Sequence, residues 1–153
     1  MRQRSAGILL YRLEDGNVQV LLVHPGGPFW INKDAGAWSI PKGLYEADED
    51  SLSAAKREFE EETGFVVDGD FLDLGELKQP SGKIVHAWAI AGNLDVSQLR
   101  SNTFELEWPR HSGQIQHFPE VDKGAWFDMT TAREKISAGQ AAFLDRLLAA
   151  LSG

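Results

Sequence analysis

Apolar runs separated by a short polar turn predict a hairpin at the start of the chain. Residues 5–13 and 18–24 are rich in aliphatic and β-branched side chains, and Asp15-Gly16 lies between them. An Asp-Gly pair between two such runs is typical of a tight β-hairpin. The glycine- and proline-rich residues 25–30 that follow predict a long loop.

The clearest helix signal covers residues 50–63, which contain neither glycine nor proline. Leu52, Ala55 and Phe59 recur there at helical spacing, Asp50 is a candidate cap, and a glycine follows as a stop signal. Such a pattern predicts an amphipathic helix. Its polar side is then free to carry chemistry.

Further apolar segments predict the remaining elements, although the sequence does not indicate how the strands pair. The expected strands cover residues 38–41, 65–67, 71–77, 83–90 and 104–108. A polar loop is expected over residues 109–119, a helix cap at Thr130 or Thr131, and a final helix over residues 140–151 that covers a sheet. No repeat or linker divides the chain, so we predict a single domain over residues 1–153.

The composition fits one globular unit. The chain has 153 residues, 42% hydrophobic and 25% charged, which is enough for one sizeable core. It contains no cysteine, which excludes disulfides and thiolate chemistry and fits a reducing compartment. Its apolar runs are far shorter than the roughly 20 residues of a membrane-spanning helix. We therefore expect a cytoplasmic protein with no membrane partner.

Acidic residues are concentrated in one short segment. The formal net charge is −8, and residues 46–62 carry eight acids against two bases. This distribution disfavours binding to nucleic acid by cationic attraction, and we expect no nucleic-acid partner. The rest of the chain is nearly neutral, so the acidic segment is the first place to look for chemistry.

Three carboxylates in this segment are expected to share one face of the helix. Glu58, Glu61 and Glu62 lie at positions i, i+3 and i+4, whereas Glu60 points away. Their mutual repulsion is removed by a bound divalent cation, and an all-oxygen set suits Mg²⁺ or Mn²⁺ better than zinc. The alternative is an acidic helix face exposed to solvent, which describes Glu60 better than the other three.

The glutamates belong to a longer spaced pattern made of Gly43, Glu49, Arg57-Glu58-Phe59, Glu61-Glu62 and Gly64-Phe65. This pattern resembles the sequence motif of the Nudix hydrolase family, the Nudix box. The resemblance implies an α/β fold, the Nudix α/β/α sandwich with a mixed sheet flanked by helices, over essentially the whole chain. It also implies Mg²⁺-dependent hydrolysis of a diphosphate bond in a nucleoside diphosphate linked to another group.

The resemblance assigns roles to individual residues. Glu58, Glu61, Glu62 and the backbone carbonyl of Lys42 are the implied metal ligands, and the Lys42 ammonium is a candidate phosphate contact. Arg57 and Glu49 are the implied structural pair that holds the loop against the helix. The proton acceptor is either Glu120 or Glu61, with a plain loop carboxylate as the alternative for Glu120, and His117 is expected to be a polar loop residue. No covalent nucleophile is needed, and no Ser/His/Asp arrangement is identifiable in the sequence.

Among the substrates that the resemblance allows, we favour dinucleoside polyphosphates over ADP-ribose and nucleoside triphosphates. The segment Trp38–Gly43, together with Trp126, resembles the diadenosine tetraphosphate hydrolase branch, whereas Pro80 matches a marker of ADP-ribose pyrophosphatases and equally suits a turn. Nucleoside triphosphates are a third candidate substrate class. A non-catalytic nucleotide sensor is a candidate of a different kind, but the intact set of three carboxylates favours an enzyme. Candidate side chains for stacking on a base and holding distal phosphates, with core packing as their alternative, are Phe29, Trp30, Lys83 and His86.

Overall fold

The computed structural model describes residues 3–152, so the ends of the predicted domain, residues 1–2 and 153, lie outside it. The strands are β1 (Arg4–Glu14), β2 (Asn17–Pro25), β3 (Lys42–Leu44), β4 (Leu72–Lys78), β5 (Ile84–Ala91), β6 (Thr103–Glu107), β7 (Ile115–Pro119) and β8 (Val121–Asp128). The helices are α1 (Ser51–Thr63), α2 (Met129–Lys135) and α3 (Ala141–Ser152), with short 3₁₀ turns η1 (Val96–Gln98) and η2 (Ala138–Gln140).

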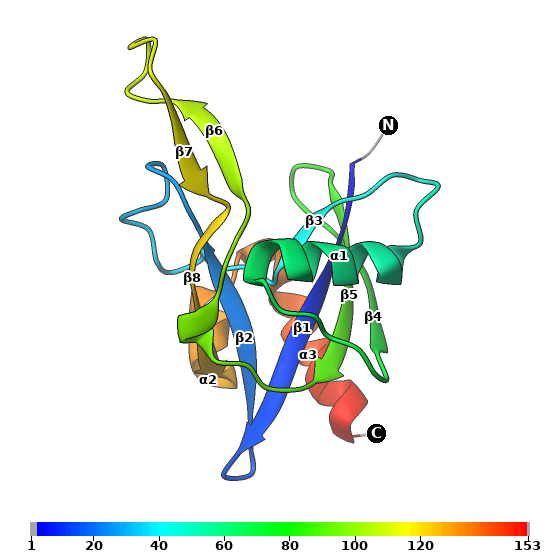
Figure 1. Cartoon of the computed structure of the whole chain (residues 1–153). Coiled ribbons are helices and arrows are strands. Elements are labelled where there is room, and N and C mark those ends of the chain that lie inside the picture. The colour runs from blue at the N-terminus through cyan, green and yellow to red at the C-terminus, as the bar shows by residue number, and fades with distance from the viewer. Residues whose placement is uncertain (1–2, 153) are drawn as a thin grey trace.

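The main sheet is mixed and covered on both faces. Its strand order is β4-β5-β1-β2-β8, and β3 pairs with β1. The β1–β5 pair is parallel, whereas β1–β2, β2–β8 and β4–β5 are antiparallel. Helix α1 covers one face, and α2 and α3 cover the other (Figure 1). The structure is therefore the α/β/α sandwich that the resemblance implied.

Strand β1 is buried on both faces because it lies in the middle of the sheet. Leu9 packs in the cluster with Phe143 and Leu147 of α3, whereas Ile8 packs in the cluster with Phe59 of α1. Successive side chains of a strand point to opposite faces, so one continuous apolar run supplies both cores. The predicted final helix is confirmed, including its role of covering the sheet.

Local signals predicted the first hairpin and the acidic helix correctly. Asp15 and Gly16 both have positive φ, at 51° and 80°, as a tight turn with two left-handed residues requires. The Asp50 carboxylate accepts a hydrogen bond from the Ser53 amide at the start of α1. Gly64, at φ 81°, ends the helix by donating from its amide to the Glu60 carbonyl.

Four expectations were wrong, three because contacts distant in sequence decided the structure and the fourth because a neighbouring aspartate caps the helix. Residues 65–67 form no strand; Phe65 and Val67 pack instead against the α1 side of the core. Residues 38–41 make only isolated bridges to β2 and to Ile136, and the strand begins at Lys42. The expected loop at 109–119 contains β7, paired with β6. Helix α2 is capped by Asp128, one residue before it begins, and not by a threonine.

Strands β6 and β7 form a separate two-stranded ribbon, here called the arm (residues 103–119). The arm projects from the body of the molecule beside α1 and β8 (Figure 1). Its base is closed by a hydrogen bond of 2.8 Å from the Glu120 amide to the Asn102 carbonyl. The two residues at the base therefore keep a fixed spacing on the side of the sheet that holds α1.

Candidate metal and phosphate site

An acidic pocket of about 360 Å³ lies between β3, α1 and the base of the arm. It is lined by Lys42, Gly43, Leu44, Glu58, Glu61, Glu62, Asn102 and Glu120. The structure thus brings together the four glutamates and the lysine for which sequence analysis expected metal or proton-transfer roles. Glu60 does not line the pocket and is exposed.

Glu62 is the most strongly perturbed of these carboxylates. Its Oε1 accepts a hydrogen bond of 3.3 Å from the Lys42 amide. Burial raises the pKa of Glu62 to about 8, and the negative charges of Glu58 and Glu120 add to this shift against the opposing effect of Lys42. Ionised Glu62 therefore needs a positive partner in the pocket at neutral pH.

Glu58 lies against the backbone of β3. Its Oε1 accepts a hydrogen bond of 2.8 Å from Arg57 Nη1, and burial followed by the charge of Glu61 raises the pKa of Glu58. A Cβ at Gly43 would lie 1.9 Å from Glu58 Oε2, so any larger residue there would displace the carboxylate. Glycine at position 43 is therefore a steric requirement of this carboxylate cluster.

The donor set fits a hard divalent cation. The carboxylates of Glu58, Glu61 and Glu62 supply only oxygen. The pKa values of Glu58 and Glu62 are raised first by burial and then by neighbouring negative charge, and a bound cation would offset both effects. Within residues 3–152, no three acidic, histidine or cysteine side chains already form a complete metal-binding group, and Glu58 and Glu62 are hydrogen-bonded to neighbours. A bound cation would compete with those hydrogen-bond donors for the carboxylate oxygens.

Arg57 and Glu49 form a bidentate ion pair that ties the loop before α1 to the helix. Arg57 Nε lies 3.0 Å from Glu49 Oε2, and Nη2 lies 3.0 Å from Oε1. These hydrogen bonds raise the pKa of Arg57 above its already high usual value. Sequence analysis did not predict that Nη1 also contacts Glu58 and, at 3.5 Å, Glu61. Arg57 therefore positions two carboxylates of the pocket as well as the loop.

Replacement of Arg57 by alanine is expected to lower both kcat and the melting temperature, because it leaves Glu49 unpaired and releases Glu58. We expect a loss of activity of about tenfold or more and a melting temperature lower by several degrees. Steady-state kinetics and thermal melts would measure both. Lys56→Ala is the matched control, since its partner Asp68 is exposed. A variant with native stability and only a raised KM would place Arg57 on the substrate.

Glu120 stands between β7 and β8 and is positioned through its backbone. Its amide bonds to the Asn102 carbonyl, and the Asn102 amide donates to the carbonyl of Glu61 at 2.8 Å. The Gly26 amide donates to the Glu120 carbonyl at 3.0 Å, and a Cβ at Gly26 would lie 2.0 Å from the Pro119 carbonyl oxygen. The far wall of the acidic pocket is therefore connected to α1 by main-chain hydrogen bonds that no local sequence signal predicted.

The acidic pocket continues into a longer groove. A cavity of about 220 Å³ shares Lys42, Glu62 and Glu120 with the acidic pocket, and it shares Pro25, Ser39 and Lys42 with a third cavity of about 460 Å³. The third cavity is lined mainly by apolar surface and includes Trp30 and Lys83. We call the three cavities together the long groove. Lys42 lies on the wall of all three.

Two other candidates lie away from the long groove. Phe29 packs edge to face on Trp108 of the arm, with ring centroids 5.4 Å apart, and Arg110 lies over its ring. His86 is hydrogen-bonded to Ser51 and Asp73. His117 is exposed on the arm, as expected of a polar residue, although it belongs to β7 and not to a loop.

The groove also contains residues that the sequence did not predict. These are Asn102, Ser39 and Gln140.

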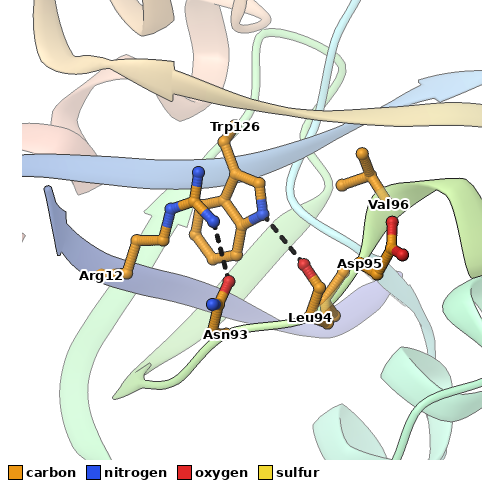
Figure 2. Close-up of a pocket in the computed structure, with 6 residues that line it drawn as sticks. All are labelled: Arg12, Asn93, Leu94, Asp95, Val96 and Trp126. Atoms are coloured by element: carbon orange, nitrogen blue, oxygen red, sulfur yellow. Dashed lines mark hydrogen bonds between the residues drawn. The ribbon is translucent and has the colours of Figure 1, made fainter.

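A separate cavity of about 430 Å³ contains none of the glutamates of the acidic pocket in its walls (Figure 2). Arg12 lies 4.2 Å above the centroid of the Trp126 ring and donates to Asn93 Oδ1. Trp126 Nε1 donates to the carbonyl of Leu94. The polar groups that line this cavity are thus largely bonded to one another. Trp126, which contributed to the resemblance to the diadenosine tetraphosphate hydrolase branch, lines this cavity and not the long groove.

Comparisons with known proteins agree on the fold. A family model described as NUDIX domain matches residues 1–147. A search among curated proteins found no match. In the described part of the chain, no helix has the length and apolar character needed to cross a membrane.

Several solved structures resemble this one over nearly the whole chain. The Ap4A hydrolase of C. elegans in a binary complex is 22% identical with a TM-score of 0.64, over 99% of this chain and 98% of that chain. The NUDIX domain of Shewanella oneidensis NrtR complexed with ADP ribose is 16% identical with a TM-score of 0.66, over 99% and 89%. A MutT protein from Methanosarcina mazei Go1 is 22% identical with a TM-score of 0.63, over 99% and 96%. At identities this low, the structural matches establish the fold alone.

Proposed function

We propose that this chain, which belongs to the NUDIX domain family, is a pyrophosphohydrolase that uses Mg²⁺, or Mn²⁺ in its place, to cleave a dinucleoside polyphosphate. The observation that carries this proposal is the long groove. Its acidic end suits a cation and a diphosphate, and its apolar end, with Trp30 in its wall, suits a nucleoside. Lys42, between the two ends, suits the phosphate chain that joins them.

The pocket residues would divide the work between metal binding, proton transfer and phosphate binding. Glu58, Glu61, Glu62 and the Lys42 carbonyl would hold the cation, which when bound neutralises the diphosphate and lowers the pKa of water. Glu120 is the favoured proton acceptor because it lines the same pocket as this cluster, on a backbone held by two hydrogen bonds. Glu61 is the alternative. Lys42 and Lys83 would hold phosphates along the groove.

A panel of nucleotides tests the substrate. Diadenosine tetraphosphate, ADP-ribose and the nucleoside triphosphates would each be incubated with the protein and Mg²⁺, and the products identified by chromatography and mass. We expect the highest kcat/KM for the dinucleoside polyphosphate. ADP-ribose is the second candidate, because Pro80, the residue that matches a marker of ADP-ribose pyrophosphatases, lies in the wall of the apolar cavity. Tight binding of any of these compounds without turnover would favour a nucleotide sensor.

Truncation of Trp30 or Lys83 is expected to act on substrate binding. Trp30→Ala removes the aromatic wall of the apolar cavity, and Lys83→Ala removes a cation from it. We expect each to raise KM about tenfold, with a smaller change in kcat. Stacking of a base on an aromatic ring is worth about 1–3 kcal/mol, and a hydrogen bond to a charged phosphate is worth about 1.5–3 kcal/mol. Lys78→Ala, on the neighbouring strand and outside the groove, is the control. An unchanged KM in both variants would show that the nucleoside does not bind in this cavity.

A further inference from the structure

Three side chains on the α1 face of the sheet form a Ser-His-Asp chain that the Nudix reaction does not use. Ser51, the first residue of α1, has its Oγ 2.9 Å from His86 Nδ1 on β5. His86 Nε2 lies 2.7 Å from Asp73 Oδ1 on β4. None of the three lines the long groove. Their separations of 35 and 13 residues explain why the sequence showed no such arrangement.

The partners of each atom determine where the protons are. The hydrogen bond with His86 lowers the pKa of Asp73, so its carboxylate is ionised at neutral pH and can only accept. Nε2 therefore carries the proton, and Nδ1 of a neutral ring is an acceptor. Trp88 Nε1, which can only donate, gives a hydrogen bond of 3.1 Å to Ser51 Oγ. The Ser51 hydroxyl proton is thus directed at His86 Nδ1.

The chain is held by its surroundings. His86 stacks on the Trp88 ring with centroids 4.8 Å apart and an interplanar angle of 23°. The β4–β5 register shifts between Asp73 and Glu76, and within that irregularity the Gly75 amide donates to Asp73 Oδ1 at 2.8 Å. Gly75 has φ 76°, a conformation that favours glycine. The carboxylate is therefore oriented by backbone and the imidazole by an aromatic ring.

We propose that Ser51 is a nucleophilic serine, activated by His86 and Asp73, that takes up an acyl group from small activated esters. Ser51 Oγ forms a bond to the ester carbonyl carbon and its proton passes to His86 Nδ1. The bond from that carbon to the leaving alcohol oxygen breaks, and the leaving group takes the proton from Nδ1. The products are an acyl-Ser51 ester and a free alcohol or phenol.

Ser51 is a modification site and not an efficient esterase. A fast acyl transfer needs amide donors for the oxyanion, and helix N-termini commonly supply them. Here the Ser53 amide, in the first turn of α1, is bonded to the Asp50 carboxylate. The acidic cap also places a negative charge beside Ser51. Acylation is therefore slow. Deacylation is slower still, because the serine alkoxide of the acyl-enzyme is a poorer leaving group than the phenol of an activated ester, and the acyl-enzyme accumulates.

Labelling with 4-nitrophenyl acetate tests this proposal. The whole protein would be incubated with the ester, its mass measured over time, and the acetylated residue located by peptide mapping. We expect one acetyl group per chain, on Ser51, and none in Ser51→Ala. His86→Gln and Asp73→Asn should label about a hundredfold and about tenfold more slowly, respectively. Ser112→Ala, at an exposed serine of the arm, is the control and should label like the wild type.

Two further measurements separate the outcomes. Glu62→Gln, which disables the proposed pyrophosphohydrolase site, should still be acetylated at the wild-type rate. Circular dichroism would show whether each variant is folded, and Asp73→Asn, at a partly exposed carboxylate, serves if His86→Gln does not fold. Acetylation of lysines in place of Ser51, or wild-type labelling rates in folded His86→Gln or Asp73→Asn, would overturn the proposal.

Discussion

Replacement of Glu62 by glutamine is expected to lower kcat about a hundredfold or more while the protein stays folded. Metal ligation of a phosphoryl group supplies several kcal/mol of transition-state stabilisation, and each 1.4 kcal/mol is about tenfold in rate. Glutamine keeps the size of the side chain and an oxygen that can accept from the Lys42 amide. The fold should therefore survive the loss of the charge.

Glu60→Gln is the control for this experiment. Glu60 lies on the same helix, is exposed, and does not line the acidic pocket, so the same chemical change there should leave kcat nearly unaltered. Steady-state rates on the substrate identified by the nucleotide panel would compare the two variants. A Glu62→Gln variant that retains more than about a tenth of the wild-type rate would show that Glu62 is not a metal ligand.

The metal-free protein is expected to lose stability as the pH rises from about 4.5 to about 8. Burial raises the pKa of Glu62 from 4.5 to about 8. Between these values the native state holds a proton that the unfolded chain has released, so unfolding becomes more favourable as the pH rises. The loss should be on the order of a few kcal/mol, and it should end above the native pKa, where both states are ionised.

Mg²⁺ should restore this stability, and more strongly at pH 8 than at pH 5, because it binds the ionised carboxylates. At a free concentration of 100 times its dissociation constant it would add about 2.7 kcal/mol. Urea unfolding in EDTA and in Mg²⁺ would measure both effects. A Glu58→Gln, Glu61→Gln, Glu62→Gln triple variant should lose both the Mg²⁺ response and most of the slope between these pH values.

A second triple variant provides the matched control. Glu46→Gln, Asp48→Asn and Glu60→Gln remove the same charge from exposed positions of the same acidic segment. This variant should keep the wild-type pH dependence and the wild-type response to Mg²⁺. If the wild type and both triple variants respond alike, the cation acts on net charge, and this face of α1 is not its site.

Sequence predicted the parts of the molecule that local interactions determine. The hairpin at Asp15-Gly16 and the helix that begins after Asp50 and ends at Gly64 depend on neighbours along the chain. The convergence of Glu58, Glu61 and Glu62 follows from helical spacing alone. Strand β7 could not be predicted, because a segment of five mostly exposed residues becomes a strand only by pairing with β6. Residues 65–67 show the reverse, an apolar run that packs on the core without a strand partner.

The position of Glu120 in the candidate site could not be predicted either, because it depends on contacts between segments distant in sequence. Glu120 was found through a family spacing, but its connection through Asn102 to Glu61 joins segments that nothing local relates. The chain of Ser51, His86 and Asp73 combines a helix cap, a strand and a shifted register, none of which is unusual by itself. Such sites become visible only when the sheet is assembled.

The closed base of the arm has a consequence for how this protein can change. Glu120 is hydrogen-bonded to Asn102 and Gly26 through the backbone. The two ends of the arm therefore stay together even if residues are added to it. Doubling the length of a flexible loop costs only about 0.6 kcal/mol of closure entropy. The tip at residues 109–114 is therefore a natural point for insertions. A peptide inserted there would project from the molecule, and the backbone of Glu120 would keep its position relative to α1.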